Sequence, residues 1–183
     1  MISNCSFSGI SSPNVLHNLT IAPRLDYSTE LLSEIIEILK KKRSEIKKSN
    51  QFILDEFEDD KICQRALEVE QTIAFSLEIL SQIQKRTVMI SNISNIPEIL
   101  PLAIPMIRQI SAQLHVLLPQ CSQKLSELSV HLGSIVLDSA TLTEANFDFS
   151  SFNEESTILL DEVKLMVDSK ISKQYPNLDF FKA

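Results

Sequence analysis

The sequence predicts an all-α fold, and three observations lead to that prediction. Only two glycines occur among 183 residues, and Leu, Ile, Glu, Lys, Ser and Gln dominate, which favours helices and leaves few tight turns. Hydrophobic residues make up 44% of the chain, enough for one domain with its own core. The third observation is an apolar seam whose steps of three and four residues follow one helical face for about eight turns. The apolar seam consists of Ile107, Ile110, Leu114, Leu117, Cys121, Leu125, Leu128, Leu132 and Ile135.

Pro119 divides the apolar seam. A proline there ends one helix and begins another, or kinks a single one, and it suits the first position of a helix. The seam keeps its phase across the proline, so we expect both pieces to face the same core. Prolines at positions 97, 101 and 105 form the preceding break, which predicts one helix over 105–118 and another over 119–138. The seam residues assigned to the core or to an assembly contact are Ile107, Ile110, Leu114, Leu125, Leu128 and Leu132.

A long first helix is predicted before this pair. Residues 1–27 are rich in Ser and Asn, and we expect an irregular N-terminal arm there. Ser28 and Thr29 are suitable N-caps for a helix that should end near residue 57. In the heptad that follows, Arg43 and Asn50 take equivalent positions, where polar groups weaken a seam but fix its register. The heptad positions are Leu32, Ile36, Leu39, Arg43, Ile46, Asn50, Ile53 and Phe57.

A second long helix should fold back on the first. The acidic residues around Glu58 mark a hairpin turn, and the next helix is expected from Lys61 to about Ile93. A second apolar row widens its apolar face, so this helix should contact more than one partner helix. Its main stripe is Ile62, Ala66, Val69, Ile73, Leu77, Leu80 and Ile83, and the second row is Leu67, Ala74, Phe75 and Ile79.

The C-terminal part should contain a linker and an acidic helix. Residues 139–152 are predicted to link the helical core, 28–138, to a C-terminal helix and tail, 153–183. Asn153 should cap this helix and Tyr175-Pro176 should end it. Residues 144–183 contain eight acidic and four basic residues, a net charge of −4. The apolar positions assigned to a regulatory tail helix are Ile158, Leu159, Val163 and Met166.

A basic segment lies in the first long helix. Between residues 40 and 48, six cations and one anion give a charge of +5, although the whole chain carries −7. Such a run is either a solvated helix face or a contact for anionic lipid or an acidic partner, where each cation can contribute about 1 kcal/mol. An acidic C-terminal helix folded back on the hairpin would give a closed state; the alternative is a fifth helix in a fixed bundle. The basic segment, a candidate membrane-binding surface, comprises Lys40, Lys41, Lys42, Arg43, Lys47 and Lys48.

Several functional classes are disfavoured. No nucleotide-binding loop, nucleophile elbow or zinc-protease motif occurs. Glu127 and His131 come nearest to the Glu-x-x-His pair of a di-iron bundle, but their spacing differs and the pair is not repeated, so we expect no metal, cofactor or catalytic residue. The net charge of −7 argues against nucleic acid as a partner. Cys5, Cys63 and Cys121 form no disulfide framework, and we find no signal peptide or membrane-length apolar run, so we expect a cytoplasmic protein.

The order of these features resembles an ESCRT-III core, and more closely its archaeal cell-division branch, the CdvB-like proteins. A hairpin with a basic first helix is followed by two shorter helices, a linker and an acidic terminal helix, and Pro119 falls at the family's inter-helix proline. The similarity covers about Ala66 to Leu178. It is carried by ALEVEQTIAFSLEILSQI from Ala66, by the stretch from Ile99 to Ser139, and by TLTEANFDF, NEESTILLDEV and YPNL.

The resemblance implies a non-enzymatic subunit that polymerises on the cytoplasmic face of the membrane at the division site and constricts or remodels it during archaeal cell division. The implied partners are further copies, paralogous ESCRT-III-like subunits, an anionic membrane surface and an AAA ATPase. No proline-rich recruitment motif occurs here, so contact with the ATPase would be indirect. By resemblance, the basic first helix meets lipid and the acidic terminal helix regulates. The alternative is a cytosolic helical-bundle adaptor that binds a partner helix without polymerising.

Overall fold

The structure, a computed structural model, describes residues 21–56, 60–90, 93–143 and 149–176. Within these ranges the protein consists of five α-helices and one short 3-10 helix, with no strand, so the predicted all-α class is confirmed. The elements are α2 (Ile21–Glu56), α3 (Asp60–Val88), η1 (Ile93–Asn95), α4 (Ile96–Leu114), α5 (Pro119–Thr143) and α6 (Phe149–Gln174).

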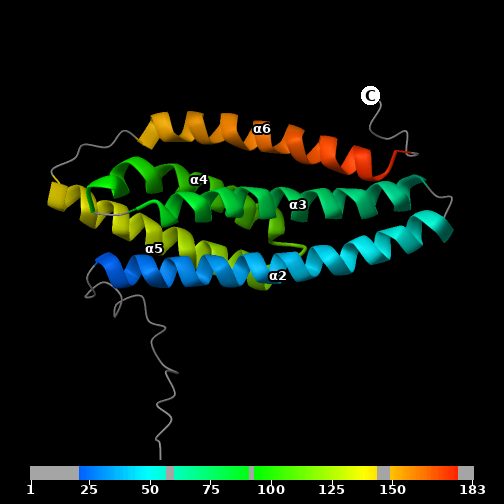
Figure 1. Ribbon diagram of the computed structural model, residues 1–183, viewed down its shortest axis with the longest axis horizontal. Helices are drawn as coiled ribbons and strands as arrows, with labels where there is room; N and C mark the ends of the chain where they lie inside the picture. The colour runs from blue at the N-terminus through cyan, green and yellow to red at the C-terminus, as the bar shows by residue number, and fades with distance from the viewer. Residues whose placement is uncertain (1–20, 57–59, 91–92, 144–148, 177–183) are drawn as a thin grey trace, which may run out of the picture.

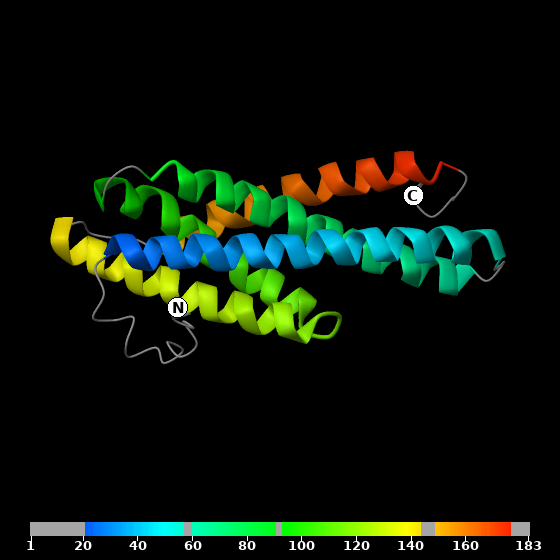
Figure 2. The same ribbon diagram turned by 60° about the horizontal axis from the view of Figure 1, so that its bottom comes forward.

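The helices form two antiparallel hairpins and one covering helix (Figure 1). The hairpin of α2 and α3 packs on the hairpin of α4 and α5, with α2 against α5 and α3 against α4. The last helix, α6, lies on α3 and α4, so α6 and α2 occupy opposite edges of the molecule in Figure 1. The α2–α3 hairpin is the longer one, and it extends well past the turn between α4 and α5 (Figure 2).

The first helix begins earlier than predicted. Because α2 starts at Ile21, the irregular arm expected over 1–27 is wrong for residues 21–27, while 1–20 lie outside the described residues. Arg24 is buried in this first part of the helix, where it forms an ion pair with Asp138 of α5 and donates a hydrogen bond to Ser134. Pro23 is tolerated because the first helical turn needs no backbone N–H donor. These contacts with α5 stabilise helical turns that precede the predicted caps at residues 28 and 29.

The prolines before the apolar seam do not form a break. Helix α4 begins at Ile96 and holds Pro101 and Pro105 inside it, so the prediction of a start at Pro105 is wrong. Each interior proline removes one backbone hydrogen bond, at a cost of about 3 kcal/mol. Burial offsets this cost, because α4 is apolar on nearly every side and packs against α3, α5 and α6. The buried apolar residues between its start and Ile107 are Ile96, Leu100, Pro101, Leu102, Ala103, Ile104, Met106 and Ile107.

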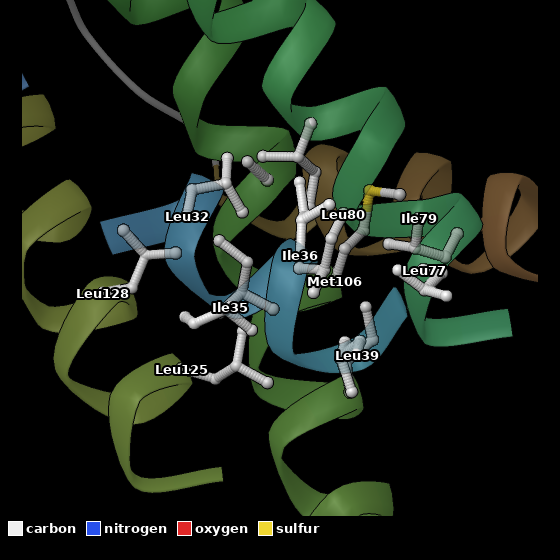
Figure 3. Packing of buried hydrophobic residues seen from close by; sticks show 14 of the residues in the cluster. Leu32, Ile35, Ile36, Leu39, Leu77, Ile79, Leu80, Met106, Leu125 and Leu128 are labelled. Carbon is white, nitrogen blue, oxygen red and sulfur yellow. The ribbon is translucent and has the colours of Figure 1, made fainter. Parts of the chain in front are cut away.

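The apolar seam lies in the core, with one exception. Eight of its nine members are buried, and Pro119 is the first residue of α5, as predicted. The exception is Leu117, which is 37% exposed because α4 ends at Leu114 and residues 115–117 form the turn between the two helices. The seam therefore belongs to two antiparallel helices rather than to one kinked helix. Figure 3 shows Leu125 and Leu128 of this seam beside Leu32 and Ile35 of α2.

Other boundaries differ by a few residues. Helix α3 ends at Val88 rather than near residue 93, and Ile62, predicted for its apolar stripe, is 42% exposed. Helix α5 continues to Thr143 and α6 begins at Phe149, ahead of the predicted cap at Asn153, so only residues 144–148 of the expected linker remain, and they lie outside the described residues. The prediction that the second long helix touches several partners is confirmed, because α3 packs on α2, α4 and α6.

Candidate functional site

The basic segment presents only part of its charge to solvent. Lys40, Lys41 and Lys48 are exposed, whereas Lys42, Arg43 and Lys47 are half-buried. Two of these lysines form ion pairs within α2: Lys40 with Glu37 at 2.6 Å between Nζ and Oε1, and Lys42 with Glu45 at 2.7 Å between Nζ and Oε2. The free positive charge is thus smaller than the run of residues suggests.

The neighbouring lysines favour the charged form of the Glu45 carboxylate. Lys42 donates a hydrogen bond to its carboxylate, and this bond, helped by the charges of Lys42, Lys41 and Lys48, lowers the pKa of Glu45. Charged hydrogen bonds stabilise the ionised carboxylate. The basic segment therefore contains one permanent anion, and its exposed cations are the ones on which a contact with an anionic surface depends.

A buried carboxylate lies one helix away from the basic segment. Glu70 of α3 is fully buried, at 0% exposure, and three neutral donors from two other parts of the chain surround it. Asn50 of α2 donates to Oε2 at 2.8 Å and also to the Ala66 carbonyl at 3.1 Å. Tyr175 donates its phenolic hydrogen to Oε2 at 2.9 Å, and Gln174 donates to Oε1 at 3.3 Å. We call Asn50, Glu70, Gln174 and Tyr175 the Glu70 cluster.

The Glu70 cluster joins three elements at one point. Asn50 is one of the two polar residues that interrupt the heptad of α2, and its double contact ties α2 to α3 in one register, as predicted for a polar group at such a position. Gln174 and Tyr175 stand at the C-terminal end of α6, so the same carboxylate also holds the end of that helix. Breaking this point would free the far end of α6 from the hairpin.

A cavity of about 460 Å³ opens beside the Glu70 cluster. It lies between the second half of α2 and the end of α6, next to the basic segment. Its lining residues are Lys47, Lys48, Gln51, Leu54, Asp55, Gln174, Tyr175 and Pro176. The C-terminal end of the acidic helix therefore lies directly beside two of the lysines assigned to membrane binding.

Tyr175 remains protonated over the whole physiological range. Burial, followed by the hydrogen bond to Glu70 and its negative charge, raises the pKa of the Tyr175 phenol to about 12, while Gln174 and Arg43 act in the opposite direction. A protonated phenol can donate to the buried carboxylate, whereas a phenolate would repel it. Tyr175 therefore acts as a hydrogen-bond donor that joins the end of α6 to α3.

This shift predicts an alkaline loss of stability. Since the folded pKa of about 12 exceeds the ordinary value of 10.0, the contribution of Tyr175 is fully present below pH 10 and is lost as the pH rises toward 12. We expect the gap in unfolding free energy between the unchanged protein and Tyr175→Phe to be constant up to pH 10 and to close by pH 12. Urea titrations across that range measure it. A gap that closes near neutral pH, or that never closes, would contradict the role of the phenol.

The remaining contacts of α6 are few and mixed in character. One stripe of the helix is buried against α3 and α4, and it consists of Ser156, Leu160, Val163, Val167 and Ile171. Of the four positions assigned to the regulatory helix, Val163 is buried and Leu159 and Met166 are half-buried. Ile158 was assigned wrongly, because it is 61% exposed on the opposite side of the helix. Helix α6 carries apolar residues on two sides, and the sequence analysis included Ile158 from the side that the structure exposes.

A groove borders the contact between α6 and the helices beneath it. It has a volume of about 420 Å³ and lies where α6 meets α3 and α4, with Phe75, Gln109 and Val167 among its lining residues. The polar contacts along the middle of the helix are long: Gln71 donates to Asp168 at 3.4 Å, and Lys170 and Glu78 approach to 3.4 Å. Of the described helices, α6 is thus held by fewer close contacts than the paired helices, and the Glu70 cluster supplies the closest polar ones.

The other candidate residues form structural contacts. The seam residues assigned to the core or to assembly, Ile107 to Leu132, lie in the interior and present no surface. Glu127 accepts a hydrogen bond from Tyr27 at 3.0 Å and lies 3.5 Å from His131, whose ring packs edge-on against Tyr27. Cys121 is buried, which raises the pKa of its thiol. Among the described residues no group of three or more His, Cys, Asp and Glu could hold a metal ion.

Sequence reasoning missed Glu70, Gln174 and Arg24. Glu70 lies at helical spacing from Ala66 and Ile73 on the apolar face, and a carboxylate at such a position is a detectable signal of a buried polar contact. Nothing in the sequence says which donors meet it. Tyr175 was noticed only as the end of a helix.

No protein-family model matches the chain, and no solved structure matches it. None of the described helices is both long and apolar enough to cross a membrane.

Proposed function

We propose that this protein is a non-enzymatic ESCRT-III-like subunit that polymerises on the cytoplasmic face of the membrane, at the division site, and remodels or constricts it during archaeal cell division. The observation that carries the proposal is the closure of the acidic helix α6 on the long α2–α3 hairpin at the Glu70 cluster, beside the basic segment. A detachable helix at this place can control whether the hairpin meets lipid and further subunits.

The energetics are compatible with a switch. A polar contact contributes about 1 kcal/mol and an exposed ion pair about 0–1 kcal/mol, so the closed state depends mainly on the buried stripe of α6. That stripe is one residue wide, from Ser156 to Ile171, and a groove of about 420 Å³ borders it. A membrane surface or a neighbouring subunit that binds the open form better would therefore shift the population, because only differential affinity can do so. Paralogous subunits would be further partners, and an AAA ATPase would act on the assembly through them.

The exposed lysines are expected to carry the contact with lipid. Changing Lys40, Lys41 and Lys48 together to Glu should reduce co-sedimentation with anionic vesicles by about tenfold or more, since each cation contributes about 1 kcal/mol. A matched control changes Lys85, Arg108 and Lys164, which are exposed elsewhere, to Glu and produces the same net charge. Vesicle sedimentation at low and high salt measures the difference. Equal loss in both variants, or no loss in the first, would contradict a lipid-binding basic segment.

Polymerisation has its own test. Negative-stain electron microscopy of the full chain and of Tyr175→Ala, with and without anionic vesicles, compares the closed protein with one whose α6 end is loosened. Filaments on vesicles, or deformed vesicles, that increase in the variant support control by α6. A uniform small particle under every condition contradicts it.

One observation favours a second candidate, the cytosolic adaptor that binds a partner helix. A groove of about 370 Å³ lies between α4 and α5, lined by Val130, Gly133, Leu137 and Arg108 among others. Val130 and Leu137 are 62% and 59% exposed, and a Cβ atom at Gly133 would meet nothing within 4 Å. An adaptor would stay a small particle in the microscopy above, which separates the two candidates.

A further inference from the structure

The outer side of α6 carries an apolar stripe with an acidic border. Ile158 and Leu165, seven residues apart, are 61% and 71% exposed on the side opposite the buried stripe. Four exposed carboxylates surround them, and none forms an ion pair within the described residues. This acidic face consists of Ile158, Leu165, Glu154, Glu155, Asp161 and Glu162. An anionic membrane would repel it, so its occupant must be basic.

The outer side of α2 offers a complementary surface. Lys40, Lys41 and Lys48 are exposed there, and Phe52, one turn further along, is 62% exposed. Lys41 and Lys48 form no ion pair within the described part of the chain. We call these four residues the basic face. The basic face combines cations with one large apolar side chain. It therefore complements a helix face that combines carboxylates with apolar side chains.

The two faces belong to opposite edges of the molecule. In Figure 1, α6 forms one edge and α2 the other, with α3 and α4 between them, and both helices follow the long axis in the same direction. One molecule therefore cannot bring its own acidic face to its own basic face while closed. A second copy can, and the contact then joins two different surfaces, which produces an open-ended chain unless a rotation closes it.

We infer that the acidic face of one closed subunit docks on the basic face of a second copy of this chain. The acidic residues lie in the first half of α6 and the lysines in the second half of α2, so successive copies are staggered along their long axes. The contact needs α6 in place, and it occupies lysines that would otherwise meet lipid. Anionic vesicles and a neighbouring copy thus compete for the basic face. This inference goes beyond the proposed function, because it concerns the closed protein in the absence of membrane.

The experiment is a charge exchange followed by sedimentation velocity on the full chain. The acidic-face variant carries Glu155→Lys and Glu162→Lys, and the basic-face variant carries Lys40→Glu and Lys41→Glu. We expect the unchanged protein to associate at about 50 mM salt and to dissociate at about 500 mM, where screening is short-ranged. Each variant alone should remain monomeric, with association weakened about tenfold or more. An equimolar mixture should associate again, because each variant now complements the other.

A matched control separates a specific face from total charge. Lys85→Glu with Arg108→Glu has the same net charge as the basic-face variant, but its reversed residues are exposed outside both faces and outside α6, so it should associate like the unchanged protein. Ile158→Ser with Leu165→Ser tests the apolar stripe without changing charge, and it too should weaken association. The inference is overturned if either charge variant alone still associates, if their mixture stays monomeric, or if the control is equally impaired. The acidic-face variant keeps every lysine, so vesicle binding by it tests the proposed function separately.

Discussion

Changing Val167 to Asp is expected to release α6 from the rest of the protein. Val167 is 4% exposed, in the stripe that packs on α3 and α4. A carboxylate there would be buried in an apolar stripe, while the nearest cations, Lys164 and Lys170, are exposed to solvent. Burying a charge away from water costs several kcal/mol. The contacts that hold α6 are few, so detaching the helix should relieve this cost at a lower free energy than unfolding the two hairpins. The measurement is hydrogen exchange, in which amides of 149–174 should lose protection while those of α4 and α5 keep it.

The control for this prediction lies two residues away. Leu165→Asp introduces the same carboxylate on the same helix, but Leu165 is 71% exposed on the outer side, so protection of α6 should be unchanged. Two results would count against a detachable helix. One is full protection of α6 in Val167→Asp, and the other is global unfolding of that variant, which would make α6 an inseparable part of the core. Under the proposed function, Val167→Asp should also deform vesicles more readily than Leu165→Asp.

The existence and the partners of the helices were predictable because their burial follows local periodicity. Leu32, Ile36 and Leu39 repeat at heptad spacing, and all three are buried as expected. Pro119 was placed correctly as the first residue of a helix, because proline there loses no hydrogen bond. Heptad spacing and a proline at a helix start involve only residues within about eight positions of each other. Both can therefore be recognised in the sequence without knowledge of the fold.

Boundaries failed where distant packing decides the outcome. Pro101 and Pro105 lie within α4 because this helix is stabilised by packing against three other helices. A rule based on neighbouring residues cannot predict that packing. Helix α2 begins early because the Arg24 side chain forms an ion pair with Asp138, more than a hundred residues further along the chain. Leu117 was assigned to the core by its spacing alone, yet the turn between the helices removes it from the helical face. In each case a tertiary contact outweighs a local preference.

The candidate site was predictable only in its parts. The basic segment, the acidic last helix and the polar residue Asn50 could all be read from the sequence. Their meeting at Glu70 could not, because it joins residues 50, 70 and 175 of three separate helices or helix ends. A buried carboxylate with neutral donors carries no short-range signature beyond one Glu on the apolar face of a helix. Which face of α6 is buried depended on the same long-range arrangement, and so Ile158 was placed on the wrong side.

The second large effect is expected at Leu128, which tests whether the apolar seam is a core or an assembly contact. Leu128 is 0% exposed, and Figure 3 shows it beside Leu32 and Ile35. Truncation to Ala leaves a cavity that the rigid helix pair cannot close, so the free energy of unfolding should fall by about 2–5 kcal/mol. Val130→Ala, on the same helix but 62% exposed, should change it by less than about 0.5 kcal/mol. Urea titrations at two protein concentrations measure both.

The dependence on concentration decides between the two roles. A core residue stabilises each molecule by itself, so the loss in Leu128→Ala should be the same at both concentrations. An assembly residue acts through association, so its loss would grow as the protein is concentrated and would vanish on dilution. Because Leu128 of α5 is fully buried against α2 within one subunit, we expect the first result. A loss that disappears on dilution would mean that the seam opens and pairs between copies, with the two hairpins separating before assembly.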